Sequence, residues 1–486
     1  MAERKRILLI TNSELGQANV YLAVGQELLK QDTTIDLHIA SFAPLEKGVV
    51  SAVPGATFHK LNGATWKEAL FGRPEHRFEE ICSMHPTMWN AEEAALIMPR
   101  IATPWTSEEY VDLVQQTEKI VTEVNADLVL ADNLFTPAIT VLWKLKPNWH
   151  VLSPNTYREF IMVTQPRYEA FWKHPPNDYS PRSTISYPIS WYLIPSAIYQ
   201  LYQYTKNATN PYWINHAKYI YEKIGTEYSD WGRVAMWPPE GLKIILPSNS
   251  VVDFPFSVVP DHLVSCGPIV LPTKPLKEID AGMAVWIAKR PTVYINLGTH
   301  ATYEEADARE LAGALKILLD AAKENGQELQ VLWKLKKRGE YSGEGFSAIL
   351  ESIGSEWEKN VRILDWLEAE PMTILESGNI VCSVNHGGAN SYFEAVSAGV
   401  PQVVLPVWFD TYDFATRVEY LGIGKRGSTN HAPKCAAKEL GPILKQVVLG
   451  KSAEGFRKKA AELAEACKAE GGGRVIAAKA ILKELK

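Results

Sequence analysis

The chain has 486 residues, more than one hydrophobic core usually spans, so we expect two domains. Hydrophobic residues make up 46% and charged residues 22% of the sequence, as in ordinary soluble globular proteins. The net charge of −6 and the isoelectric point near 6.1 exclude the basic footprint of a nucleic-acid-binding protein.

The five cysteines are scattered, odd in number and without metal-ligand spacing, so they indicate reduced thiols of a cytoplasmic protein. Near the first residue only positions 7–10 form an apolar run, which is too short for the hydrophobic part of a signal peptide. No run of about 18 apolar residues occurs, so no membrane span is predicted. We expect a cytoplasmic protein with at most peripheral membrane contact.

The first half of the chain alternates predicted strands and helices. We expect strands at 7–11, 35–40, 128–131, 151–153 and 244–247, and helices at 20–31 and 111–124. This alternation predicts a parallel sheet joined by right-handed crossovers. The first domain is expected to cover residues 1–268.

Within this half, residues 157–237 contain nineteen Phe, Trp and Tyr residues and many prolines. Two interpretations stay open: an aromatic core of irregular helices, or an apolar ligand pocket or membrane-facing surface. Core packing accounts for most of these side chains in either case. The amphipathic stretch 194–204 is a candidate for membrane contact, although it has little basic character.

A proline-containing linker, residues 269–290, leads to a second α/β domain at residues 291–465. We expect its first strand at 292–296, followed by Leu297, Gly298 and Thr299. Further predicted elements are a helix at 304–324, strands at 329–334 and 361–364, and closing helices at 456–467 and 474–486.

The stretch 380–410 has the pattern of a strand, a glycine turn, a helix and a second strand. The strands are expected at 380–384 and 403–407 and the helix at 391–398, with Asn390 or Ser391 as its N-cap. Free backbone N–H groups in such a turn and the positive end of the helix form an anion site. His386 adds a side-chain donor there.

This stretch resembles the signature of the family 1 glycosyltransferases, which use nucleotide sugars. The pattern H-x-G-x-N-S-x-x-E, then G-V-P, then P-x-x-x-D is present with every spacing kept. The matching residues are His386, Gly388, Asn390, Ser391, Glu394, Gly399, Val400, Pro401, Pro406 and Asp410. The upstream Trp366 resembles the tryptophan that stacks on uracil in that family, with two extra residues between it and the motif.

The resemblance implies the GT-B architecture: two doubly wound, Rossmann-like α/β domains of parallel sheet that face each other across a cleft. The second domain then binds a UDP-sugar, with Thr299 in the diphosphate loop and Asp410 at the sugar. Thr411 is expected beside Asp410 at the sugar, at a position where many members have a glutamine. The acceptor binds in the first domain, and a final helix at residues 466–486 crosses back to that domain.

The resemblance fails at the general base. In the family a histidine in the turn after the first strand removes the acceptor proton, and here that position is Gln17, whose amide takes no proton near neutral pH. Asp132 resembles the carboxylate that orients this histidine. Without the imidazole, Asp132 or Glu14 is left to act directly or through water, and a helix N-cap is the alternative role for Asp132.

Two hypotheses about function follow. The first is an inverting glycosyltransferase that moves a sugar, glucose being expected, from a UDP-sugar to an apolar, aromatic or polyketide-like acceptor without a metal ion. The second is a related protein that binds UDP-sugar but has lost sugar transfer or catalyses another reaction in the cleft. The residues expected at the phosphates, His386 and Ser391, and Glu394, which is expected to accept hydrogen bonds from the ribose hydroxyls, favour the first hypothesis. Gln17 favours the second. The residues around 401–424 also resemble fungal members of the family.

Overall fold

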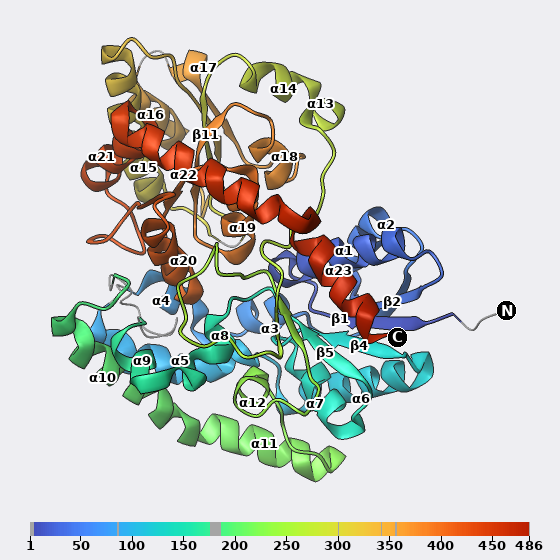
Figure 1. Cartoon of the computed structure of the whole chain (residues 1–486). Coiled ribbons are helices and arrows are strands. Elements are labelled where there is room, and N and C mark those ends of the chain that lie inside the picture. The colour runs from blue at the N-terminus through green and yellow to red at the C-terminus, as the bar shows by residue number, and fades with distance from the viewer. Residues whose placement is uncertain are drawn as a thin grey trace.

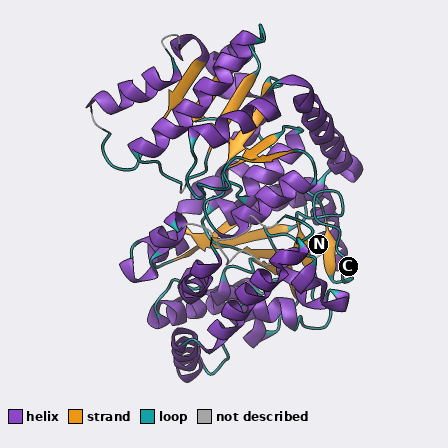
Figure 2. Ribbon diagram, turned by 90° about the vertical axis from the view of Figure 1, so that its left-hand side faces the viewer, coloured by secondary structure: helices purple, strands orange, loops and turns teal. Residues whose placement is uncertain are grey.

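The computed structural model describes residues 4–84, 87–174, 186–299, 301–341, 343–354 and 357–485. Two α/β domains lie one above the other, and in each a parallel sheet is covered by helices (Figure 1, Figure 2). No helix of the described segments combines the length and apolar composition that a membrane crossing needs.

The first domain is built on a sheet with the strand order β3-β2-β1-β4-β5-β6-β7, in which every neighbouring pair is parallel. Its strands are β1 (Arg6–Ile10), β2 (Asp36–Phe42), β3 (Thr57–Leu61), β4 (Leu128–Ala131), β5 (Trp149–Leu152), β6 (Ile244–Leu246) and β7 (Leu263–Ser265). The central strands β4 and β5 are buried along their whole length, as expected for a sheet with helices on both faces.

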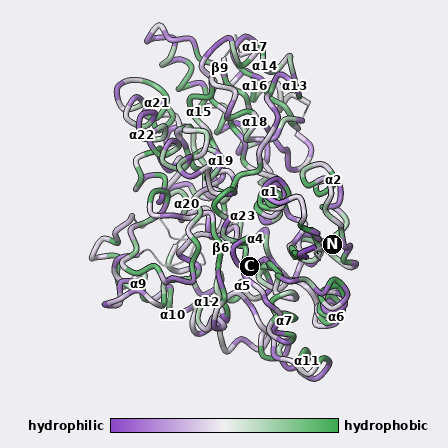
Figure 3. The backbone as a smooth tube through the Cα atoms, turned by 45° about the vertical axis from the view of Figure 1, so that its right-hand side comes forward, coloured by the Kyte–Doolittle hydropathy of each residue, from purple (hydrophilic) through white to green (hydrophobic). Residues whose placement is uncertain are grey.

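Helix α6 packs an apolar face into the core of this domain, where Leu113, Val114 and Val121 are buried. Figure 3 shows both hydrophilic and hydrophobic residues along the backbone of α6. The helices are α1 (Leu15–Gln31), α2 (Glu46–Ala52), α3 (Trp66–Phe71), α4 (Phe78–Ser83), α5 (Ala91–Ala102), α6 (Ser107–Val124), α7 (Thr136–Leu145), α8 (Arg158–Ile161), α9 (Glu169–Trp172), α10 (Ile194–Lys206), α11 (Pro211–Ile224) and α12 (Trp231–Met236).

The second domain repeats the topology of the first, with the parallel strand order β10-β9-β8-β11-β12-β13. Its strands are β8 (Thr292–Asn296), β9 (Gln330–Lys334), β10 (Val361–Leu364), β11 (Ile380–Asn385), β12 (Gln402–Val404) and β13 (Gly424–Arg426). Its helices are α13 (Leu276–Ile279), α14 (Ala281–Ile287), α15 (Glu305–Glu324), α16 (Gly343–Ile353), α17 (Trp357–Asn360), α18 (Pro371–Leu375), α19 (Ala389–Ala398), α20 (Phe409–Tyr420), α21 (Ala437–Val448) and α22 (Gly450–Lys468).

In each sheet the strand order reverses between two central neighbours, β1 and β4 in the first and β8 and β11 in the second. Ligands of open α/β sheets bind beyond the carboxyl ends of the strands at such a reversal. The loops after β4, β8 and β11 contain Asp132, Thr299 and His386, and Gln17 lies in the first turn of α1, which follows β1. The topology therefore brings residues from four distant parts of the chain to two facing sheet edges.

The predicted fold class, two Rossmann-like parallel α/β domains, is confirmed. The strands β3, β7 and β13 were not predicted. They are short edge strands with weak apolar patterns. The predicted linker, residues 269–290, contains the two helices α13 and α14. Met283, Trp286 and Ile287 of α14 pack against the second sheet.

The last helix, α23 (Gly473–Glu484), leaves the second domain and packs on the first. Ala477, Ala478 and Ile481 share a core with residues of β1 and α1, and Figure 1 shows α23 beside α1. Gly473, the first residue of this helix, lies directly against the chain segment that joins the domains. A Cβ at this position would overlap the carbonyl oxygens of Gly267 and Pro268, so no larger residue fits without a shift.

We expect Gly473→Ala to destabilise the protein by about 1–3 kcal/mol, because the added methyl group forces the helix start away from Gly267. The matched control is Gly455→Ala in α22, where a Cβ meets nothing within 4 Å. This control should leave stability unchanged or raise it by up to about 1 kcal/mol, because alanine favours helix over glycine. Urea unfolding measures both, and equal effects of the two substitutions would contradict the packing described.

Candidate active site

A cleft of about 400 Å³ lies between the two domains, at the facing edges of their sheets. The loops after β1 and β4 and helix α8 line it on one side, and the loops after β8 and β11 line it on the other. The two topological reversals therefore open into one common space, as expected for a ligand site shared by both domains.

On the second-domain side, the loop after β11 wraps tightly around the His386 ring. A Cβ at Gly298 would lie 2.7 Å from Cε1 of His386, and one at Gly388 would lie 2.5 Å from its Nε2. Gly387 has a φ of +82°, and a Cβ there would lie 2.6 Å from the carbonyl oxygen of Thr411. Gly298 and Gly388 are required by the close approach of the backbone to the His386 ring, and Gly387 is required by its close approach to Thr411.

Helix α19 follows this loop and begins earlier than predicted. Its N-cap is Gly388, and both Asn390 and Ser391 lie within the first turn, so the prediction of an N-cap at either residue is wrong. Two glycines before the helix allow the backbone itself to form the turn without a capping side chain. Ser391 lines the cleft beside the free N–H groups of this turn, and Asn390 Nδ2 donates to the carbonyl oxygen of Leu15 in the first domain at 2.8 Å.

Glu394 lies one turn into α19 and lines the cleft close to Glu370. Burial, reinforced by the negative charge of Glu370, raises the pKa of Glu394 to about 8. A carboxylate with this environment gains from ligand hydroxyl groups that donate hydrogen bonds to it.

Trp366 and Lys334 stand together at the same side of the cleft. The indole is 66% exposed, and the Lys334 ammonium lies 4.4 Å from the centre of its ring. Burial lowers the pKa of Lys334, with neighbouring Lys336 adding to the effect. Thr299 is exposed at the cleft edge, and its carbonyl oxygen accepts a hydrogen bond from Lys336 at 2.7 Å.

Asp410 is placed in the cleft by the first turn of α20. Thr411 is not. Its side chain is fully buried, and its hydroxyl accepts from the backbone N–H groups of Val407 at 3.1 Å and Trp408 at 3.0 Å. The prediction that Thr411 contacts the donor sugar is corrected by this position, because the hydroxyl is used to hold the turn that presents Asp410.

The first-domain wall is aromatic, but its rings come mostly from a part of the sequence that carried no prediction. Trp66, Phe71 and Phe78, from α3 and α4, line the cleft together with Ile101. Of the aromatic residues in 157–237, Trp231 lines it, whereas Tyr157 and Phe160 belong to the core. The interpretation as an aromatic core therefore holds for Tyr157 and Phe160, and the interpretation as a ligand pocket holds for Trp231.

Several other aromatic side chains of 157–237 lie on the surface. Trp191 and Tyr168 are about four-fifths exposed, at 81% and 78%, and Tyr202 of α10 is also exposed. Contact of this surface with a membrane stays a prediction, because neither partner nor lipid is part of the structure.

Gln17 and Glu14 both line the cleft at the start of α1. The Gln17 Oε1 atom is buried and has no hydrogen-bond partner among the described residues. Glu14 accepts a hydrogen bond from the backbone N–H of Lys67, and burial raises its pKa above the ordinary value. A carboxylate with a raised pKa is a stronger base than one in water.

Asp132 lies behind this wall and does not reach the cleft. It is fully buried, and it accepts hydrogen bonds from Thr11 Oγ1 at 3.1 Å and from the Leu134 N–H at 2.9 Å. Burial raises its pKa to about 6. The N-cap of α7 is Phe135, so the alternative prediction of an N-cap role for Asp132 is wrong, and direct contact with an acceptor is inconsistent with its burial.

Several cleft residues were not predicted from the sequence, namely Glu159, Lys334, Glu368 and Glu370. Lys334 is the last residue of β9, and a polar residue at the carboxyl end of a parallel strand is a signal that could have found it. No local pattern marks the other three.

The architecture defines a protein of the GT-B class, in which two Rossmann-like domains share one cleft. A UDP-glucosyltransferase from Polygonum tinctorium that glucosylates indoxyl has the same fold, with a TM-score of 0.66 at 14% identity over 100% of this chain and 99% of that one. The glycotransferase of kitacinnamycin matches with a TM-score of 0.66 at 17% identity over the full length of both chains.

Residues 350–481 match the erythromycin biosynthesis protein CIII-like, C-terminal domain family. The glycosyltransferase sdnJ of Sordaria araneosa is 33% identical to the chain over 97% of its length and 96% of that protein. The erythritol-mannosyl-transferase 1 of Mycosarcoma maydis is 34% identical over a shorter part, 25% of this chain and 20% of that protein. The chain belongs to the family 1 glycosyltransferases, and it is a glycosyltransferase of the UDP-glycosyltransferase type.

The buried Asp132 should make stability depend on pH in a defined direction. Below about pH 4 the carboxyl is protonated in folded and unfolded chains alike. Between about pH 4 and its folded pKa of about 6, only the unfolded chain ionises, so ionisation lowers stability as pH rises, by up to about 3 kcal/mol in total. Asp132→Asn should lose this dependence and gain stability relative to the native chain above pH 6.

Urea unfolding of both proteins between pH 4 and pH 8 measures the difference. A difference that stays constant across this range would contradict the raised pKa of Asp132.

Proposed function

We propose that the protein is an inverting, metal-independent transferase that moves a hexose, glucose in the first instance, from a UDP-sugar to an apolar, aromatic or polyketide-like small molecule. The observation that carries the proposal is a single cleft in which the glycine loop around His386 faces the aromatic wall of Trp66, Phe71 and Phe78. One side suits a nucleotide diphosphate and the other suits a flat, apolar acceptor.

The donor half supplies positive groups for the leaving diphosphate. The N-terminus of α19, the His386 ring and Lys334 surround the position that the phosphates would take. Trp366 offers a face for the uracil base, and Glu394 offers acceptors for the ribose hydroxyls. These groups support transfer without a metal ion, because they provide the charge compensation that a cation would otherwise supply.

In the proposed reaction, the acceptor oxygen attacks the anomeric carbon from the face opposite the phosphate. The bond to the UDP oxygen breaks, the acceptor proton passes to a base, and the configuration inverts. Glu14 is the residue that we assign as the base, because it lines the cleft and has a raised pKa, whereas Asp132 is buried. Gln17 orients the acceptor as a hydrogen-bonding group.

A second candidate function is binding of UDP-sugar without sugar transfer. Gln17 at the position of the family's catalytic histidine favours it. The two functions differ in a screen of UDP-sugars against a panel of phenols and alcohols, read by mass spectrometry. Transferred sugar supports the first function, and binding without product supports the second.

We also propose a cytoplasmic location. The support is that the five cysteines are free thiols, and that Cys266, Cys382, Cys435 and Cys467 are buried in the folded chain.

Two substitutions separate nucleotide binding from sugar binding. Glu394→Ala should weaken UDP binding by about 1–3 kcal/mol, because both oxygens that accept hydrogen bonds from the ribose hydroxyls are lost. Asp410→Ala should leave UDP affinity nearly unchanged and remove most transfer, because UDP lacks the sugar that Asp410 holds in the proposal. Calorimetry with a chelator present measures binding, and product formation measures transfer. Loss of binding on chelation, or weak UDP binding by Asp410→Ala, would contradict these roles.

Glu14→Gln should lower kcat/KM for alcohol acceptors by about 10²- to 10⁴-fold, the usual contribution of a general base. Acidic phenols should lose less, because they ionise without help. Since the pKa of Glu14 is raised, the native profile should fall as pH drops through that raised pKa, and this acid limb should disappear in the variant. Equal rates for variant and native enzyme with both acceptor classes would exclude Glu14 as the base.

A further inference from the structure

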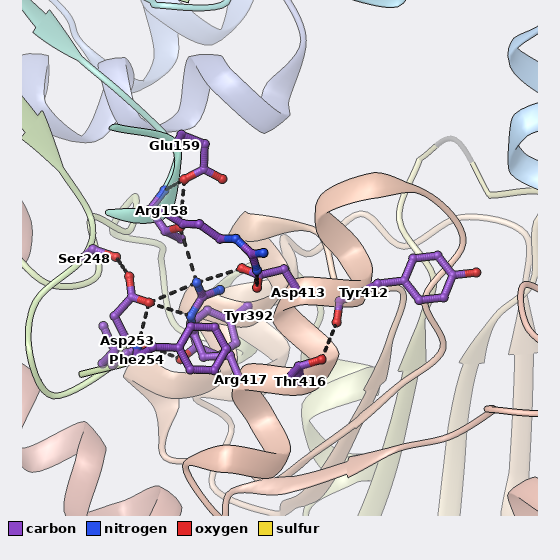
Figure 4. A network of polar contacts seen from close by, with 12 residues as sticks. Arg158, Glu159, Ser248, Asp253, Phe254, Tyr392, Tyr412, Asp413, Thr416 and Arg417 are labelled. Carbon is purple, nitrogen blue, oxygen red and sulfur yellow. Dashed lines mark hydrogen bonds and ion pairs between the residues drawn. The ribbon is translucent and has the colours of Figure 1, made fainter. Parts of the chain in front are cut away.

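Four charged side chains meet where α8 of the first domain touches α20 of the second (Figure 4). Arg158 forms an ion pair with Asp413, and Arg417 Nη2 lies 2.8 Å from Asp413 Oδ2. Arg417 Nε in turn donates to Asp253 Oδ1 at 3.0 Å. All four side chains are at most 4% exposed. We call this set the interdomain charge cluster.

The interdomain charge cluster is electrically balanced, with two guanidinium groups against two carboxylates. Asp253 also accepts from Ser248 Oγ at 2.5 Å and from the Phe254 N–H at 2.8 Å. The guanidinium carbon of Arg417 lies 4.8 Å from the centre of the Phe254 ring and 4.9 Å from that of Phe414. Paired charges in such apolar surroundings are stable in one relative arrangement, because a small displacement leaves a buried charge without its partner.

Both helices of the cluster also carry a residue of the cleft wall. In α8, Arg158 belongs to the cluster and the adjacent Glu159 lines the cleft. In α20, Asp413 belongs to the cluster and Asp410, three residues earlier on the same helix, lines the cleft.

A hydrogen-bonded relay links the two walls a second time. Arg417 Nη2 donates to Thr156 Oγ1 at 3.3 Å, and that hydroxyl donates to Glu159 Oε2 at 2.8 Å.

We propose that the interdomain charge cluster sets the position of the sugar-binding Asp410 relative to the acceptor wall. Arg158, Asp253, Asp413 and Arg417 are thus positioning residues: they touch neither substrate, and they hold α20 in register with α8 across the domain boundary. Directional bonds to planar guanidinium groups fix this register more narrowly than apolar contacts, which tolerate sliding.

The two domains are also joined by an exposed ion pair, which serves as a control for the buried cluster. Arg338 Nη2 of the second domain lies 2.7 Å from Glu79 Oε2 of the first, and both side chains are exposed to water. An exposed pair contributes little to geometry, because solvent screens its charges and replaces its hydrogen bonds. Substitutions there change an ion pair between the same two domains without disturbing the cluster.

The kinetic test uses Arg158→Met/Asp413→Asn, which removes one positive and one negative charge and leaves Arg417 paired with Asp253. This test rests on the proposed transfer of sugar from a UDP-sugar. We expect kcat for transfer to fall about 100-fold, the usual result of a misplacement of about 1 Å, while UDP affinity and hydrolysis of the UDP-sugar change less than about threefold. The single variant Arg158→Lys, which keeps the positive charge, should have a kcat between those of the double variant and the native enzyme. Glu79→Gln should have the kcat of the native enzyme.

Transfer within about threefold of native in the double variant would overturn the proposal. So would an equal fall of transfer, hydrolysis and UDP binding, because that pattern indicates a loss of folded protein rather than of register.

A second measurement does not depend on activity, so it still decides the proposal if the native chain transfers no sugar. Spin labels are placed at exposed positions Lys47 in α2 and Lys323 in α15, in a Cys82→Ser background, because the other cysteines are buried. The distribution of distances between the labels should broaden or shift in Arg158→Met/Asp413→Asn and stay native in Glu79→Gln. Identical distributions in both variants would overturn the proposal.

Discussion

Parallel strand direction is the constraint on which this structure depends. In a parallel sheet every strand ends at the same edge, so loops far apart in the sequence are collected along one line. Here two sheets of the same strand order place their reversals at one cleft, and residues following β1, β4, β8 and β11 meet there. Each half of the cleft is therefore formed at a reversal of strand order, one in each sheet.

The second-domain half of this cleft depends on glycine as much as on its polar groups. Gly298 and Gly388 leave room for the His386 ring, and Gly387 has a left-handed backbone conformation that brings the loop against Thr411. The tight loop directs the first turn of α19 into the cleft. In the proposed function, the anion site at this loop is therefore built mainly from backbone, and side chains add selectivity to it.

The ion pairs that join the two domains differ in strength, because some are buried and others are exposed to water. Removing one partner of a buried ion pair typically costs about 3–5 kcal/mol, whereas an exposed pair is worth about 0–1 kcal/mol. The Arg417–Asp253 pair is of the first kind and the Arg338–Glu79 pair is of the second. Together with α23, which packs the end of the chain onto the first domain, the buried contacts decide how the two cleft walls face each other.

The family, the fold class and most residues that line the cleft on the second-domain side could be predicted from the sequence alone. The residues concerned are local: a strand, a glycine turn and a helix follow one another within residues 380–398, and their spacing carries the pattern of the nucleotide site. The absence of the family's histidine at Gln17 is equally a local fact. Such features depend on interactions between residues a few positions apart, and the sequence shows them directly.

The aromatic wall of the cleft on the first-domain side was decided only by tertiary structure. Trp66, Phe71 and Phe78 lie at the cleft because α3 and α4 face the second domain, where the ring centres of Phe78 and Trp408 are 5.7 Å apart, while most of the aromatic-rich segment 157–237 lies elsewhere. The burial of Asp132 against Thr11 and the meeting of Arg158 with Asp413 are of the same kind. Contacts between residues more than a hundred positions apart depend on how complete domains pack, and no short pattern in the sequence encodes them.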